Sequence, residues 1–257
     1  MNSSISRNCP TLYNLKEIMH NMHYKKVLRF MLFLSMTFLF LNCGGKDGSS
    51  EHKENNDFKL FPDNFFIPDY HESSTLTGKE IEGLKISAFY NLNNDSDSYV
   101  INGEYAVLIN ETITTLGNAE MWLMPSTYRT IYFSNSPTNR RMLAQSKSPP
   151  YGYGITIPCT SAGTLPLSAK IGDSGMVATF TYDDGAVENI FWKITDAAND
   201  LANLILSTTI TDPDGNAKSS EEDIYLIDHE GNRKSITVIM YNPIDDITMT
   251  LSGDITY

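Results

Sequence analysis

The sequence has little cysteine, few basic residues and no long apolar run. Its 257 residues include 3 cysteines, and 31 acidic residues outnumber 19 lysines and arginines. Because nucleic-acid affinity depends on lysine and arginine neutralising phosphates, this balance argues against a nucleic-acid partner. The longest apolar run, residues 30–41, has 12 residues, whereas a transmembrane helix needs roughly 20. The run is therefore too short to span a membrane.

The apolar run lies where a secretory signal peptide has its hydrophobic region. Three basic residues come just before it: Lys25, Lys26 and Arg29. After it, the sequence FLNCG at positions 40–44 resembles the lipobox of bacterial lipoproteins. This resemblance implies that a signal peptidase removes residues 1–42. Cys43, which has received a diacylglyceryl group, then becomes the mature N-terminus.

The resemblance also implies a location. Gly44 rather than an aspartate follows the cysteine, and by the sorting rule of lipoproteins this residue implies the outer membrane. The resemblance also implies that acyl chains such as palmitate attach the protein to it. Met19 and Met22 are alternative starts, and with either of them residues 1 to about 21 lie upstream of the true start. The expected partner is thus the membrane, to which the lipid on Cys43 attaches the protein. A protein, glycan or small-molecule partner stays open.

Removal of the leader changes the charge and the cysteine count. It takes away five basic residues and one acidic residue, so the net charge goes from −12 to −16. Cys9 leaves with the leader and Cys43 carries the lipid, so Cys159 remains alone and no internal disulfide is possible. We expect Cys159 to be a small buried hydrophobic residue, with intermolecular pairing and a reactive thiol as the alternatives.

The mature chain divides into a tether and a folded part. Residues 44–57 contain no apolar side chain, which predicts a flexible tether over residues 43–57. Residues 58–257 are expected to form the folded domain. Proline and glycine cluster near 158–166, which marks a soft boundary, and we leave open whether the two halves share one sheet.

Apolar residues alternate with polar ones along the folded part, which is the period of a β-strand. The apolar residues Ile236, Val238 and Met240 share one face in SITVIMY at 235–241, and Ile247, Met249 and Leu251 share one face in ITMTLSG at 247–253. Asn-Gly, Asp-Gly and similar turn signals separate about a dozen such segments. The sequence therefore predicts an all-β fold, an antiparallel meander that forms a β-sandwich or a closed or partly open barrel. A short helical turn is expected near 196–203.

Two segments are predicted to supply parts of the core. TFTYDDGAVENIFWKI at 179–194 predicts a hairpin in which Trp192 shares an inward face with Ile190 and Ile194. FKLFPDNFFIPDY at 58–70 combines five aromatic residues with two prolines, so we expect an irregular segment whose rings pack over one end of the core. An exposed patch for a partner is the alternative.

One tetrapeptide matches a catalytic motif. GDSG at 172–175 matches the sequence around the nucleophile of trypsin-like serine proteases. That chemistry also needs a histidine base and an oxyanion hole. His52 lies in the tether, His71 lacks the family's sequence context, and Met176 replaces the glycine that follows the motif. We therefore interpret the residues around Ser174 as a hairpin turn and expect no catalytic residue.

A second segment partly matches a calcium-binding loop. In DPDGNAKSSEED, oxygen-bearing side chains occupy loop positions 1, 3, 5 and 12: Asp212, Asp214, Asn216 and Asp223. Ala217 stands where the sharp turn needs glycine, and Asp223 replaces the bidentate glutamate. We therefore predict a hairpin loop, with Asp212, Asp214 and Asn216 as weak cation candidates, and neither a metal site nor a cofactor.

Three functions fit these observations. We expect a lipid-anchored extracytoplasmic β-domain with a non-catalytic binding or structural role at the bacterial cell envelope. The alternatives are an envelope hydrolase whose acids come from different strands, and a carrier that holds an apolar ligand inside a barrel. AKIGDSG at 169–175 and YLIDHEGNRKSIT at 225–237 are weakly similar to uncharacterised exported bacterial proteins, which implies no particular activity.

Overall fold

The computed structural model describes residues 57–78, 86–95, 99–116, 126–136, 140–148, 155–243 and 246–257. The predicted signal peptide, the lipobox with Cys43, and all of the predicted tether except Asp57 lie outside the described residues. Asp57 already belongs to the first strand. In the described part of the chain, no helix has the length and apolar character that crossing a membrane requires.

Every regular element in the described residues is a β-strand, which confirms the all-β prediction. In chain order the strands are β1 Asp57–Lys59, β2 His71–Gly78, β3 Ser87–Asn94, β4 Tyr99–Ile101, β5 Glu104–Leu116, β6 Thr127–Ser134, β7 Met142–Ser148, β8 Ile155–Pro158, β9 Ser161–Ala162, β10 Ser168–Lys170, β11 Ser174–Thr181, β12 Val187–Asp196, β13 Ala202–Thr211, β14 Ala217–Ile227, β15 Arg233–Asn242 and β16 Ile247–Asp254.

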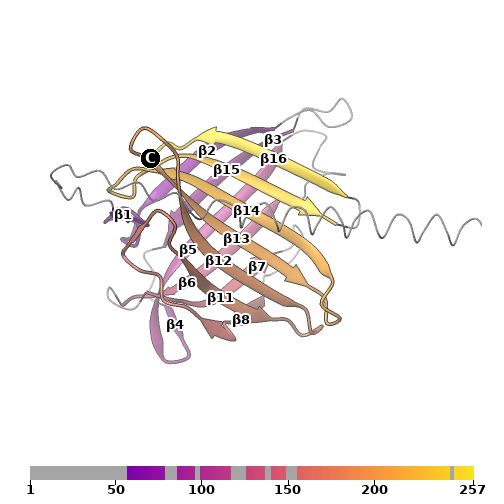
Figure 1. Cartoon of the computed structure of the whole chain (residues 1–257). Helices are drawn as coiled ribbons and strands as arrows, with labels where there is room; N and C mark the ends of the chain where they lie inside the picture. The colour runs from indigo at the N-terminus through magenta and orange to yellow at the C-terminus, as the bar shows by residue number, and fades with distance from the viewer. Residues whose placement is uncertain are drawn as a thin grey trace, which may run out of the picture. The chain divides into compact units, whose positions relative to one another are not determined.

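Within the described residues, 14 strands form one antiparallel sheet, and β1 and β10 form a second sheet of two strands (Figure 1). The order along the large sheet is β8-β7-β6-β5-β3-β2-β16-β15-β14-β13-β12-β11-β9, with β4 pairing with β5. Most neighbours are consecutive in the chain, so the predicted meander is confirmed. Because β16 pairs with β2, strands from both sides of residues 158–166 belong to one sheet.

The large sheet curls so that strands near its two ends face each other across the interior (Figure 1). An ion pair between side chains on β7 and β12, which are close to opposite ends of the strand order, crosses this interior. The chain between β8 and β9 joins the two edges, because Cys159 N donates to Leu143 O and Thr160 N donates to Thr179 O. One curled sheet with joined edges corresponds to the partly open barrel rather than to two stacked sheets.

The inward face carries the residues that the alternating pattern predicts. Trp192 is 6% exposed, and Ile190 and Ile194 on the same face of β12 are also buried. Val238 and Leu251, which are paired across β15 and β16, are fully buried. The pattern locates the core side of these strands because successive side chains of a strand point to opposite faces.

The helical turn expected near 196–203 is instead a tight turn between β12 and β13. Ala198, Asn199 and Asp200 have φ angles of 61°, 53° and 62°, which lie in the left-handed region. The β12–β13 ladder extends to the pair Asp196 and Ala202, so only residues 197–201 remain to reverse the chain. A right-handed helical turn does not fit into this connection, because the two strands remain paired up to its first and last residues.

Segment 58–70 covers one end of the core. Phe58, Phe65 and Tyr70 are buried, whereas Phe61 and Phe66 are partly buried and pack against the core. The rings of Phe61, Phe65 and Phe66 lie within 4.6 to 5.2 Å of one another, centre to centre. After the short strand β1 the segment consists of turns, so its aromatic packing matches the prediction.

Candidate functional site

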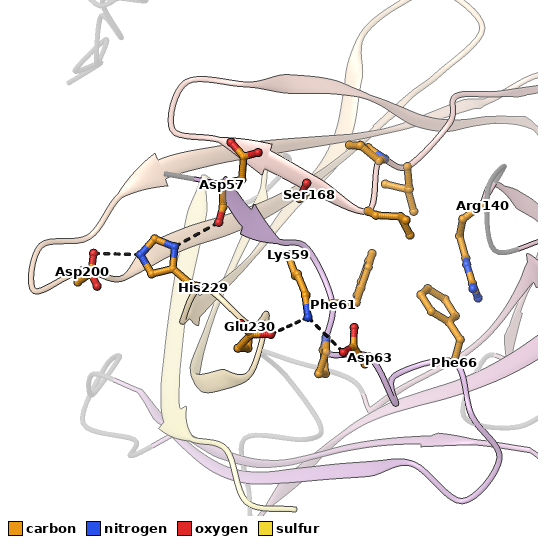
Figure 2. A pocket seen from close by; sticks show the side chains of 14 residues that line it. Asp57, Lys59, Phe61, Asp63, Phe66, Arg140, Ser168, Asp200, His229 and Glu230 are labelled. Atoms are coloured by element: carbon orange, nitrogen blue, oxygen red, sulfur yellow. Dashed lines mark hydrogen bonds and ion pairs between the residues drawn. The ribbon is translucent and has the colours of Figure 1, made fainter. Parts of the chain in front are cut away.

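A cleft of about 770 Å³ lies at the end of the sheet that segment 58–70 covers (Figure 2). Its walls come from β1 and residues 61–66, from residues 165–168, and from the hairpin turns that contain Asp200 and His229. Arg140, just before β7, completes the lining. The volume lies within the range of sites that bind small molecules.

Backbone contacts hold the walls of the cleft together. Lys59 N donates to His229 O at 3.1 Å, and Leu60 N donates to Leu167 O at 3.1 Å. Gly231 has a φ of 79°, and a Cβ atom there would lie 2.6 Å from the backbone carbon of Phe61. Glycine is therefore required at position 231, because segment 58–70 passes directly over this turn.

One end of the cleft holds paired charges (Figure 2). His229 Nε2 lies 3.0 Å from Asp200 Oδ1, and His229 Nδ1 lies 3.2 Å from Asp57 O. Both partner atoms are acceptors, so the protonated imidazolium satisfies both contacts, and the bond to Asp200 raises the pKa of His229. Lys59 Nζ lies 3.1 and 2.6 Å from the carboxylates of two further acids, Asp63 and Glu230.

The other end of the cleft holds a cation with a different environment. The guanidinium carbon of Arg140 lies 3.5 Å from the centre of the Phe66 ring, and Figure 2 shows the two side chains next to each other, away from His229. Arg140 Nε and Nη1 are buried and have no hydrogen-bond partner among the described residues. Burial lowers the pKa of Arg140. Leu165, whose N–H donates to Arg140 O at 2.8 Å, also lines the cleft.

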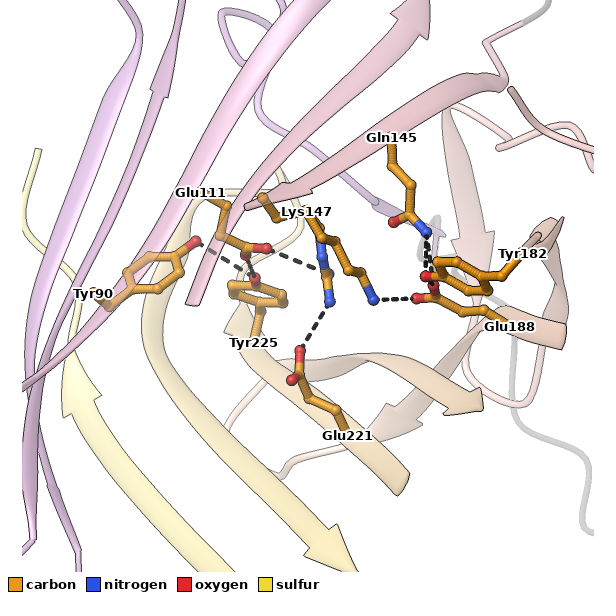
Figure 3. A network of polar contacts seen from close by, with 9 residues as sticks. Tyr90, Glu111, Gln145, Lys147, Tyr182, Glu188, Glu221 and Tyr225 are labelled. Carbon is orange, nitrogen blue, oxygen red and sulfur yellow. Dashed lines mark hydrogen bonds and ion pairs between the residues drawn. The ribbon is translucent and has the colours of Figure 1, made fainter. Parts of the chain in front are cut away.

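The interior of the curled sheet contains a second group of polar residues (Figure 3). Arg129 on β6 bridges two carboxylates, with N···O distances of 3.4 Å to Glu111 on β5 and 3.1 Å to Glu221 on β14. Tyr225 OH donates to Glu111 Oε1 at 3.4 Å and lies 3.4 Å from Tyr90 OH. These contacts tie strands from the two halves of the sheet together across the core.

A separate cluster surrounds Glu188 on β12 (Figure 3). Lys147 Nζ and Gln145 Nε2 on β7 each lie 2.6 Å from a carboxylate oxygen of Glu188, and Tyr182 OH also donates to it. Burial alone would raise the pKa of Glu188, but Lys147, Arg129 and these hydrogen bonds outweigh burial, so its pKa lies below the ordinary value. Glu188 is therefore ionised and fully paired.

A fully buried ion pair between two strands of the large sheet also contacts segment 58–70. Arg233 Nη1 on β15 donates to Glu72 Oε2 on β2 at 3.0 Å, and both residues are nearly inaccessible to solvent. The guanidinium carbon of Arg233 lies 3.9 Å from the centre of the Tyr225 ring and 4.5 Å from that of Phe65. Arg233 therefore holds Phe65, and with it segment 58–70, against the end of the sheet.

The remaining space beside the interior acids is small. Glu111, Asp223 and Arg129 line a cavity of about 50 Å³, which has room for a few water molecules but not for a substrate. Burial raises the pKa of Asp223 well above its ordinary value and also raises the pKa of Glu111. The strands do bring acids together, as the hydrolase hypothesis required, but they enclose them within a nearly filled core.

The GDSG match spans the end of the turn between β10 and β11 and the first two residues of β11. Asp173 Oδ2 accepts from Lys170 N at 2.8 Å, so the aspartate stabilises the turn between β10 and β11. Ser174 is the exposed first residue of β11. His71 is the exposed first residue of β2, a strand that lies beside β3 and β16 rather than β11, and His52 lies outside the described residues.

The calcium-like segment forms a hairpin loop. Asp212 Oδ1 accepts from the N–H groups of Asp214 and Asn216 at 3.0 and 2.8 Å. Asp223, the residue at loop position 12, lies on β14 with its side chain buried in the core. The segment 228–232 has the same D-x-x-G-N sequence and the same bonds, from Glu230 N and Asn232 N to Asp228 Oδ1. Among the described residues, no group of three or more histidine, cysteine or acidic side chains is arranged to hold a metal.

Cys159 is partly buried rather than fully buried as expected. Its sulfur contacts the carbonyl oxygens of Ser161 and Thr179, and burial raises the pKa of its thiol. It also lines a groove of about 780 Å³ beside the paired Asp184 and Lys218. The position is partly open because it lies on the segment that joins the sheet edges.

Sequence reasoning singled out the aromatic segment 58–70 but missed the charged residues of the cleft. Arg140 and His229 are about 90 positions apart in the chain, and no local motif connects them. The one signal was YLIDHEGNRKSIT, in which a turn residue, His229, is next to Glu230.

Comparisons with known proteins add little. No family model matches the chain, and no curated protein matches its sequence. Among solved structures, the chain is similar to a DUF1329 family protein from Desulfovibrio piger, with 9% identity and a TM-score of 0.24. The match covers 74% of this chain and 85% of that chain. At this TM-score the likeness carries no conclusion about function.

Proposed function

We propose that the chain is a lipid-anchored extracytoplasmic β-domain that binds a small molecule, without catalysis, in the cleft over β1 and residues 61–66. The observation that carries the proposal is a buried guanidinium, Arg140, without a partner among the described residues in a cleft of adequate size; the groove beside Cys159 has a similar volume but no such cation. The cleft offers about 770 Å³, whereas the cavity inside the curled sheet offers about 50 Å³. A ligand of metabolite size fits the first and not the second.

The anchoring part of the proposal rests on the sequence. FLNCG at 40–44 supplies the lipidation signal, and the net charge of −16 after cleavage opposes electrostatic adhesion to anionic lipid. Two acyl chains on Cys43 would hold the domain stably, since each buried methylene contributes roughly 0.8 kcal/mol. Cys43→Ser should abolish labelling by a palmitate analogue and leave an uncleaved precursor. A soluble, unlabelled wild-type protein would instead show an ordinary secretory signal.

The binding part can be tested by hydrogen–deuterium exchange. The full-length protein is compared with and without the low-molecular-mass fraction of a bacterial envelope extract. We expect slower exchange in residues 59–66 and 165–168 of the wild type. Leu167→Trp, which fills the cleft from a side chain that is 68% exposed, should remove this protection. Tyr105→Trp, at a position that is 67% exposed and outside the cleft lining, is the matched control.

The hydrolase alternative has its own test. Ester, peptide and glycan panels are run with wild type, Glu111→Gln and Ser174→Ala. We expect no activity that either substitution removes, because Glu111 faces a cavity of about 50 Å³ and Ser174 begins β11, a strand that does not pair with β2, which carries His71. Hydrolysis that is lost in one of these variants and kept in Tyr105→Trp would overturn the non-catalytic part of the proposal.

A further inference from the structure

We infer that the ligand of the cleft is a monoanion on an apolar body, a carboxylate or similar oxyanion attached to an aromatic or aliphatic group, and that Arg140 binds its charged end. The inference rests on the proposed binding function, since it names the class of ligand for the same cleft. The inference depends on the different environments of the three cations that line the cleft.

Two of the three cations already have acceptors. Lys59 lies between two carboxylates, and both ring nitrogens of His229 face oxygen acceptors. Arg140 differs, because two of its guanidinium nitrogens are buried with no partner among the described residues. A buried charged donor without an acceptor is unfavourable, and stacking on Phe66 does not supply the acceptor. An oxyanion in the cleft would supply it once the Arg140 side chain rotates so that these nitrogens face the cleft, because guanidinium binds carboxylate in a planar, two-point arrangement.

The surroundings of Arg140 define the rest of the ligand. Phe66 and the buried Leu165 lie next to it on the lining of the cleft, so the group attached to the anion meets apolar side chains. Acidic residues occupy the opposite end of the cleft, including Asp200 and Glu230 (Figure 2). A second negative charge on the ligand would be repelled there, which favours a monoanion over a polyanion.

Arg140 is also a residue that can be changed without removing a known internal hydrogen bond. Its buried Nε and Nη1 have no acceptor to lose, so Arg140→Gln should leave the fold intact. Arg140→Lys keeps the charge but not the planar arrangement and serves as the second variant. Arg141→Gln is the matched control, because Arg141 is the next residue, carries the same charge, pairs with Glu104 and does not line the cleft.

The experiment uses three naphthalene probes with one apolar body: 1-naphthoate, the neutral 1-naphthylmethanol and the cationic 1-naphthylmethylamine. Binding to the full-length protein in a non-ionic detergent is measured by calorimetry, with the detergent solution as the blank. We expect wild type and Arg141→Gln to bind naphthoate at least about tenfold more tightly than the alcohol. Arg140→Gln should remove this preference, and Arg140→Lys should keep part of it.

Three results would overturn the inference: no binding of naphthoate, equal binding of acid and alcohol by wild type, or an equal loss in Arg140→Gln and Arg141→Gln. If the wild type binds acid and alcohol equally and Leu167→Trp abolishes the binding of both, the proposed class of ligand is refuted. The cleft would then still be a binding site. Failure of the exchange experiment with the envelope fraction would count against the binding function itself. The two failures are therefore distinguishable.

Discussion

The buried ion pair between Glu72 and Arg233 is expected to behave as one unit. Their side chains are 0% and 2% exposed, and Nη1 and Oε2 lie 3.0 Å apart. Removing either partner leaves the other as a buried charge without its counter-ion, which costs about 3–5 kcal/mol. Glu72→Gln keeps an acceptor for the guanidinium and should lie at the lower end of this range. Arg233→Met leaves the carboxylate with the Tyr70 hydroxyl as its remaining hydrogen-bond donor among the described residues and should lie at the upper end.

The double variant Glu72→Gln/Arg233→Met shows whether the two side chains stabilise the fold as a pair or independently of each other. If the two charges stabilise each other, its loss of stability should be smaller than the sum of the single losses by about 2 kcal/mol or more. The stacking of Arg233 on Tyr225 and Phe65 is lost in both Arg233 variants, so it cancels from this difference. Urea unfolding of the full-length protein, followed by tryptophan fluorescence, gives the free energies.

A matched surface variant shows the size of an ordinary ion-pair effect. Lys218→Met breaks the exposed pair with Asp184, whose N···O distance is 3.1 Å, and should leave the unfolding midpoint nearly unchanged. Additive losses for Glu72 and Arg233, to within about 0.5 kcal/mol, would refute the reasoning. A single-variant loss as small as that of Lys218→Met would refute it as well.

Three further predictions follow from burial. Trp192→Ala should lower the free energy of unfolding by about 3–5 kcal/mol, because a side chain that is 6% exposed leaves a cavity in the core; near-wild-type stability in urea would contradict this. Burial raises the pKa of Asp223, so the folded state keeps a proton that the unfolded chain loses above roughly pH 4, and stability should fall as pH rises from there toward the folded pKa. Asp223→Asn should flatten this fall, and an unchanged slope of stability against pH above roughly pH 4 would count against it. Because burial raises the pKa of Cys159, iodoacetamide should label it at pH 7 more slowly in the native than in the urea-unfolded protein, and equal rates would show an accessible thiolate.

The sequence alone determined the type of structure and the core side of many strands. Alternation in 235–241 and 247–253, with Asp-Gly and Asn-Gly turns between segments, predicted an antiparallel meander, and both strands have the expected inward residues. These features are readable because the strand period and turn chemistry are local properties of the chain. The turn at 197–201 was misread because the left-handed backbone there depends on the two strands that it joins.

Only the tertiary structure decided where the charged residues lie. On β14, Asp223 faces the core while its apolar neighbour Ile224 is partly exposed, which reverses the expected pattern. Burial raises the pKa of Asp223 and so favours its neutral form there, whereas the carboxylate of Glu221 on the same strand is paired with Arg129, 92 residues away in the chain. Arg140 and His229 likewise line one cleft because the sheet curls and segment 58–70 covers its end. Such pairings depend on the closure of the sheet, which strand periodicity does not encode.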